Sequence, residues 1–225
     1  MSVTDTGSNI ETLRSELPPS VRLIAVSKTK PVKYIIEACN AGQKCFGENR
    51  VQELLDKKDN VPSDVEWHLI GHLQTNKVKY VVPFISMIQS VDSLKLLNSI
   101  NAEASKINRV VNCLLQFHIA REESKYGFSM DEIEGIIKTD GFGDLNFVRI
   151  CGVMGMATFT DDYNQIRKEF RHLRMCFEML KSGYFNSDTC FREISMGMSG
   201  DYKIAVEEGS TMVRIGSLLF GERLK

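Results

Sequence analysis

Short apolar runs rich in β-branched residues alternate along the chain with longer segments in which apolar residues recur at steps of three and four. The first pattern is typical of buried strands, and the second is typical of amphipathic helices. On this basis eight strands are predicted, over residues 21–27, 44–48, 66–71, 86–91, 110–119, 147–155, 191–197 and 211–216. The alternation indicates parallel strands that are joined by crossover helices.

Segments of helical character separate nearly all of these strands. They are predicted at residues 31–41, 49–57, 74–82, 93–105, 130–138, 163–181 and 202–208. The sixth segment is the clearest, because its apolar residues form one stripe. That stripe consists of Ile166, Phe170, Leu173, Phe177 and Leu180.

Eight strands with a helix after nearly every one fit a (β/α)8 TIM barrel better than a doubly wound sheet, which usually needs about five or six strands. The length of 225 residues is compatible with a single hydrophobic core. We therefore expect an α/β protein with one barrel over residues 21–225. Residues 1–20 are expected to form an N-terminal helix or extension.

The charge of the chain is nearly balanced, with 28 basic and 29 acidic residues and a net charge of −1. This balance gives no reason to expect nucleic acid or an anionic membrane as a partner. No segment has the apolar length of a signal peptide or a membrane span, so we expect a cytoplasmic protein. The six cysteines form no CxxC pair and are expected to be reduced. No metal site is expected, because no metal-ligand spacing occurs.

Lys28 ends the first apolar run, "VRLIAVSK", where a strand should leave the core. Strand parity places Ile24, Val26 and Lys28 on one face, so the lysine is predicted to project into the mouth of the barrel. Active sites of barrels lie at that end of the strands. Enclosure there would lower the pKa of the amine and make it available to attack a carbonyl. The alternative is a lysine that only marks the strand end and extends to water.

Small and hydroxyl-bearing residues follow the last two predicted strands, at Ser199, Gly216 and Ser217. Such residues let backbone N–H groups approach an anion, and barrels often hold a phosphate after strands seven and eight. Arg214 shares the parity of Gly216 and can point inward; alternatively, it forms a surface ion pair. Asn49, after the second strand, either meets a ligand at the mouth or caps the following helix.

A closed barrel would bring Lys28 next to the glycine and serine cluster, because the first and last strands are neighbours. A ligand that reaches both needs an aldehyde and a phosphate, which pyridoxal 5′-phosphate (PLP) carries. Arg214 would then meet the pyridine nitrogen, and a guanidinium cannot accept a proton from it.

The chain resembles a known family, the pyridoxal phosphate homeostasis proteins, which are single-domain PLP-binding proteins related to the barrel of alanine racemase. The matching segments are AVSKTKP, FGENRVQE, WHLIGHLQTNKVK, SVDS, EESKYGF, GVMGMAT and SMGMSGDYKIAVEEGSTMVRIGSLLFGER. The resemblance implies a fold-type III barrel in which Lys28 holds PLP as a Schiff base. It further implies Ser199, Gly216 and Ser217 at the phosphate, Arg214 near the pyridine nitrogen, and Asn49 at the cofactor mouth.

Two functions remain open. One is a PLP carrier that serves intracellular vitamin B6 homeostasis, with possible transient contacts with PLP-dependent apo-enzymes. The other is a racemase-like enzyme, which needs an acid/base group on each face of the substrate. Lys28 supplies only one such group, and the chain ends directly after the last barrel element, so we favour the carrier and expect a monomer.

Overall fold

The computed structural model describes residues 5–121 and 126–221. Residues 1–4 of the predicted extension, residues 122–125 in the motif EESKYGF, and residues 222–225, which include the last two residues of the final motif, lie outside the described residues. Within the described ranges, no helix has both the length and the apolar character that crossing a membrane requires.

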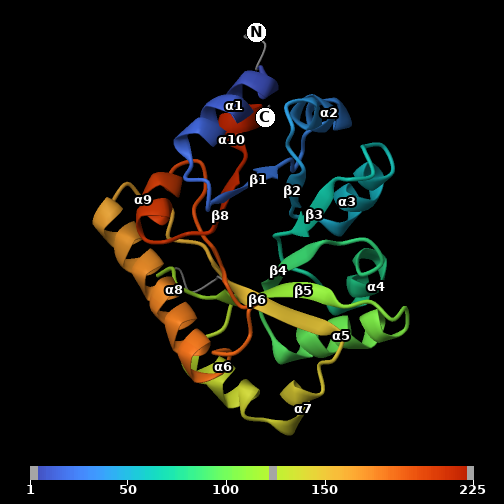
Figure 1. Cartoon of the computed structure of the whole chain (residues 1–225), viewed down its shortest axis with the longest axis vertical. Helices are drawn as coiled ribbons and strands as arrows, with labels where there is room; N and C mark the ends of the chain where they lie inside the picture. Colours follow the sequence, from blue (N-terminus) through green and yellow to red (C-terminus); the bar gives the residue numbers. More distant parts are fainter. Residues whose placement is uncertain (1–4, 122–125, 222–225) are drawn as a thin grey trace.

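The eight strands form one closed parallel barrel (Figure 1). They are β1 Arg22–Val26, β2 Cys45–Glu48, β3 Glu66–Leu69, β4 Met87–Val91, β5 Val111–Phe117, β6 Val148–Gly155, β7 Glu193–Ser195 and β8 Met212–Ile215. Neighbours in sequence are neighbours in the barrel, and β8 closes it by pairing with β1. The predicted (β/α)8 barrel is therefore confirmed, and each strand lies inside its predicted range.

Helices follow the strands as the sequence pattern predicts. They are α1 Thr6–Glu16, α2 Val32–Asn40, α3 Val51–Lys58, the 3-10 turn η1 Thr75–Lys77 with α4 Val78–Val81, α5 Leu94–Ser105, α6 Met130–Ile137, α7 Asp140–Gly143, α8 Tyr163–Gly183, α9 Tyr202–Glu207 and α10 Ser217–Phe220. The apolar stripe predicted for α8 is buried along its whole length. The helices α7 and α10 lie outside the predicted helical segments, since four residues are too few to show a helical period and α7 also includes two glycines.

The strand parity predicted for β1 holds. Leu23 and Ala25 belong to the large core between the sheet and the helices, whereas Ile24 belongs to a second, smaller apolar cluster. The other buried members of that smaller cluster are Met87, Leu114, Cys151, Met154 and Met212. Alternate residues of β1 therefore face the inside of the barrel, and Val26 and Lys28 continue that face toward the carboxyl ends of the strands.

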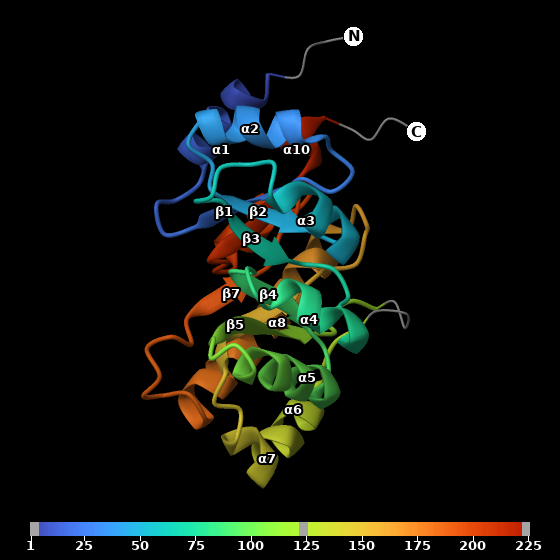
Figure 2. The ribbon, with the colours of Figure 1, turned by 90° about the vertical axis from the view of Figure 1, so that its right-hand side faces the viewer.

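Helix α1 lies at one edge of the barrel, next to the short helix that follows β8. Helix α1 packs beside α2 and α10 (Figure 2), and the side-chain amide of Asn9 donates to the Leu219 carbonyl at 3.1 Å. All six cysteines are free thiols, as expected.

Candidate ligand site at the mouth of the barrel

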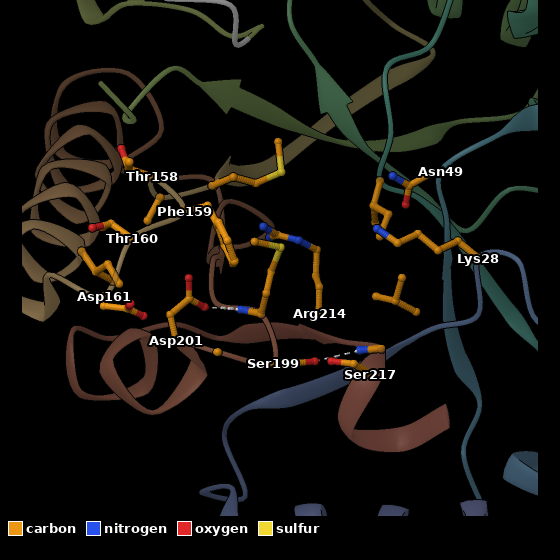
Figure 3. A pocket seen from close by; sticks show the side chains of 18 of the residues that line it. Lys28, Asn49, Thr158, Phe159, Thr160, Asp161, Ser199, Asp201, Arg214 and Ser217 are labelled. Carbon is orange, nitrogen blue, oxygen red and sulfur yellow. Dashed lines mark hydrogen bonds between the residues drawn. The ribbon is translucent and has the colours of Figure 1, made fainter. Parts of the chain in front are cut away.

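A cavity of about 400 Å³ opens where the strands end. All six residues singled out in the sequence line it, although they come from four separate segments of the chain (Figure 3). They are Lys28, Asn49, Ser199, Arg214, Gly216 and Ser217. In Figure 3, Lys28 and Asn49 face Arg214 across the cavity, and the loop of Thr158 to Asp161 forms the far wall.

Lys28 lies two residues beyond the end of β1 and is half-buried. Its place follows from the parity of the strand, because Ile24 points into the barrel and every second residue shares that direction. The side chain reaches the cavity from the same side as Asn49 (Figure 3). It therefore does not merely extend into bulk water.

Arg214 is buried inside the barrel, opposite Ile24 in the register of β1 and β8. Its guanidinium donates to Ser195 Oγ at 2.6 Å and to the Gly155 carbonyl at 2.9 Å. Burial lowers the pKa of Arg214 to about 10, which leaves the group protonated at neutral pH. The alternative of a surface ion pair is excluded by this position.

A chain of buried polar groups supports Arg214 from inside the barrel. Ser195 Oγ also donates to Gln89 Oε1 at 2.6 Å, and Gln89 Nε2 lies 2.8 Å from His68 Nδ1. Burial lowers the pKa of His68 to about 3, so the ring is neutral. Sequence patterns do not reveal this row of polar groups, because its members lie on β3, β4, β7 and β8 and meet only when the barrel closes.

The ends of β7 and β8 approach each other through Ser199 and Gly216. The Gly216 backbone N–H donates to Ser199 Oγ at 3.3 Å. A Cβ atom at position 216 would lie 3.3 Å from the Val26 carbonyl oxygen, which is tighter than ordinary packing. Glycine at this position therefore lets the chain pass close to β1 and leaves backbone and hydroxyl donors, including Ser217, at the wall of the cavity.

Asn49 lies between the cavity and an outer groove that contains Arg50, His72 and Lys77. The N-cap position of α3 is Arg50, so the alternative in which Asn49 caps this helix is wrong. Its Oδ1 atom is buried and has no hydrogen-bond partner in the described part of the chain. A buried amide oxygen without a partner is costly, and a bound donor would relieve it.

Further residues outside the six predicted ones also line the cavity. The loop after β6 contributes Thr158 and Asp161, together with Phe159, whose side chain is 97 % exposed. Lys30 lines the cavity too, but its amine donates to the carbonyls of Phe220 and Gly221, at 2.7 and 3.1 Å. Loop residues carry no periodic signal, so only the position directly after a predicted strand could have indicated them.

Cys45, Glu66 and His68 place one possible ligand atom each within 4.8 Å of one another. The cluster arises because Cys45 on β2 pairs with Glu66 on β3, a relation that spacing along one segment does not reveal. The Cys45 thiol donates to the Glu66 carboxylate at 3.2 Å, and burial raises the pKa of the thiol to about 12. A metal would have to displace that proton. The absence of a metal site stays a prediction.

Fold and cavity together define a single (β/α)8 barrel whose mouth combines a lysine after β1 with hydroxyl and backbone donors after β7 and β8. The family model described as "Alanine racemase, N-terminal domain" matches residues 4–224. The pyridoxal phosphate homeostasis protein of Aquifex aeolicus is 39% identical over 203 residues, which cover 90% of this chain and 87% of the relative. That of Escherichia coli K12 is 36% identical over 210 residues, covering 92% and 87%. The chain therefore belongs to the family of pyridoxal phosphate homeostasis proteins, as its motifs predicted.

Solved structures agree with this assignment. PipY of Synechococcus elongatus, solved without PLP, is 36% identical, has a TM-score of 0.89, and covers 96% of this chain and 100% of its own. The same protein solved with PLP bound has a TM-score of 0.87. Alanine racemase of Clostridium difficile is 13% identical, with a TM-score of 0.76 over 99% of this chain and 57% of its own, and shares the fold.

Proposed function

We propose that this protein binds PLP at the mouth of the barrel and serves in PLP homeostasis. The observation that carries the proposal is the convergence of Lys28, Arg214 and the donors after β7 and β8 on one cavity. The names of the relatives and the PLP-bound structure of PipY support the same ligand. In the proposal, Lys28 carries the aldehyde carbon of PLP, and Ser199, Gly216 and Ser217 hold its phosphate.

The residues present fit this cofactor. The cavity of about 400 Å³ lies in the range of small-molecule pockets, which span roughly 300–1,000 Å³. Asn49 lines the same cavity, and its buried Oδ1 lacks a partner among the described residues; a rotation of the side-chain amide would offer this oxygen to a hydroxyl of the ligand. The site thus offers an amine, an anion cradle and a spare acceptor.

When bound, PLP supplies an aldehyde that condenses with a lysine amine and releases one water. Arg214 uses two of its nitrogens on Ser195 and Gly155, so further N–H donors are left for an acceptor in the cavity. A guanidinium whose pKa is about 10 stays charged near neutral pH and only donates. The pyridine nitrogen would therefore remain unprotonated, which weakens the ring as an electron sink and favours holding over turnover.

We propose a carrier role without significant turnover, with transient contacts to PLP-dependent apo-enzymes as the route of delivery. The test mixes the purified, PLP-loaded protein with a PLP-dependent apo-enzyme and follows recovery of that enzyme's activity. Recovery faster than spontaneous release of PLP supports delivery by contact. Rapid racemisation of a free amino acid by the protein alone would instead favour the racemase-like alternative.

We also propose that the protein is a cytoplasmic monomer, with residues 1–20 as an extension of the barrel at 21–225. The hydrogen bond between Asn9 and Leu219 supports the assignment of residues 1–20 as an extension of the barrel, since it links α1 to α10. Sedimentation of the full chain tests the monomer. A stable dimer with the mouth of the barrel at its interface would contradict it.

A further inference from the structure

The turn that carries Lys28 is held on both sides by helix α3. Before the lysine, the Ser27 carbonyl accepts a hydrogen bond from Lys57 Nζ at 2.9 Å. After it, the Thr29 backbone N–H donates to Glu53 Oε2 at 2.7 Å. Both contacts involve a charged group, and charge-assisted hydrogen bonds are the stronger kind. The backbone on either side of Lys28 is therefore attached to two side chains one helical turn apart.

These two side chains also bind each other and the neighbouring strand. Lys57 Nζ lies 3.2 Å from Glu53 Oε2 and 2.7 Å from Glu48 Oε1, at the end of β2. Ser27 Oγ donates to the same Glu48 oxygen at 2.7 Å. Ser27, Glu48 and Lys57 are all buried, with at most 7 % of any of them exposed. Burying charged groups is costly, so their presence under this turn indicates a task beyond packing.

The backbone of Thr29 is held in a strained conformation. Its φ angle is 64°, in the left-handed region, which a β-branched residue rarely adopts. Among the non-glycine residues that the structure describes, only Asn108 shares a positive φ. Such strain persists only when the surroundings enforce it, and it is concentrated at functional sites. Two hydrogen bonds hold this conformation: the Lys30 backbone N–H donates to the Ser27 carbonyl at 3.0 Å and closes the turn, and the Thr29 N–H donates to Glu53, which is its one side-chain acceptor among the described residues.

We propose that Glu53 and Lys57 are positioning residues that hold the turn of Ser27 to Thr29 so that Lys28 projects into the PLP cavity. Neither side chain lines the cavity, so both act through the backbone of the turn. The inference rests on the proposed function, because it assigns these residues a task in presenting the PLP lysine.

The central experiment is a rescue. Glu53→Ala removes the acceptor of the Thr29 N–H, the left-handed turn relaxes, and PLP affinity at Lys28 is expected to fall about tenfold, equivalent to about 1.4 kcal/mol. Glycine adopts a positive φ without a steric penalty. Thr29→Gly should therefore restore most of the affinity in the Glu53→Ala background and change it less than about threefold alone.

Asp56→Ala is the matched control, since Asp56 is an exposed carboxylate on the same helix that accepts from Gln52 at 2.8 Å and does not contact the turn. Its PLP affinity should stay within about twofold of wild type. Lys57→Met, as a second variant, should also weaken binding at Lys28. Circular dichroism establishes that each variant is folded before its affinity is measured.

Amide hydrogen exchange in the PLP-free protein gives a second readout that does not depend on the cofactor. The exchange rate of the Thr29 amide should be at least about tenfold higher in Glu53→Ala than in the wild-type protein. In Asp56→Ala the rate should equal that of the wild-type protein. Equal exchange in Glu53→Ala and wild type would overturn the inference, as would weakened PLP binding that Thr29→Gly does not rescue. Failure of the wild-type protein to bind PLP at Lys28 would instead overturn the proposed function, while the exchange measurement still tests the turn.

Discussion

Removing the Lys57 ammonium should destabilise the protein strongly, because it leaves the Glu48 carboxylate buried without its counter-charge. Glu48 is fully buried, its Oε1 accepts from Lys57 and Ser27, and its Oε2 has no hydrogen-bond partner in the described part of the chain. Breaking a buried ion pair by deleting one partner costs about 3–5 kcal/mol. Lys57→Met, which keeps most of the side-chain volume, should therefore lower the free energy of unfolding by about that amount near pH 8.

The loss should depend on pH in a definite direction. Burial raises the pKa of Glu48, while hydrogen bonding to Lys57, its charge, and the Ser27 hydroxyl lower it. Without Lys57 the pKa of Glu48 rises further. When a carboxyl group has a higher pKa in the folded state than in the unfolded state, its contribution to stability is fully present at a pH below its unfolded-state pKa, which is about 4.3 for Glu. That contribution is lost as pH rises through the folded value, so Lys57→Met should cost less at pH 5 than at pH 8.

Urea unfolding of the PLP-free protein at both pH values measures the effect. Lys58→Met is the matched control, because Lys58 is the next residue and its ion pair with Asp59 is at the surface. It should change the free energy of unfolding by less than about 0.5 kcal/mol. Glu48→Gln in the Lys57→Met background removes the stranded charge and should recover at least about half of the loss. A loss below about 1 kcal/mol, or one equal at both pH values, would refute the reasoning.

Three further substitutions test the site and the fold. In Arg214→Lys a single ammonium replaces the planar guanidinium that donates to both Ser195 and Gly155, so PLP titrations should show weaker binding and a shifted visible absorption maximum. An unchanged spectrum would argue against contact between Arg214 and the PLP ring. Gly216→Ala brings a Cβ to 3.3 Å from the Val26 carbonyl oxygen, beside the proposed phosphate donors, and should weaken PLP binding while the circular dichroism spectrum stays the same. Wild-type affinity would remove Gly216 from the proposed site. Gly152 has a φ of 149°, and a Cβ there would lie 1.8 Å from the Glu193 carbonyl oxygen, so Gly152→Ala should lower the free energy of unfolding in urea by about 3 kcal/mol or more. An unchanged free energy of unfolding would contradict the strand geometry.

The barrel and most of the cavity were predictable from sequence because they depend on local patterns. A run such as 21–27 is apolar and β-branched wherever it lies, and strand parity alone directed Lys28 inward. Barrel closure then made the first and last strands neighbours, which brought Arg214 and Gly216 to the same mouth. These steps need only the periodicity of apolar residues and the rule that consecutive strands joined by crossover helices lie side by side in the sheet.

The features that were missed depend on contacts between segments far apart in sequence. In the sequence, Glu53 and Lys57 resemble residues on the solvated face of an amphipathic helix. Lys57 becomes buried only because α3 packs against the turn after β1 and the end of β2. The register shift between Cys113 and Leu114, where β5 meets β6, has no marker on β5. Asn49 was ambiguous in sequence, since asparagine serves caps and ligand sites equally well.

Mapping the lysine that PLP modifies tests the central claim most directly. The purified protein is saturated with PLP, its visible absorption band is recorded, the protein is reduced with borohydride, and the modified peptide is identified by mass spectrometry. We predict one principal adduct, on Lys28, and loss of the band in a folded Lys28→Ala variant. An adduct mainly on Lys30 or another lysine, or a band that survives in Lys28→Ala, would contradict the account.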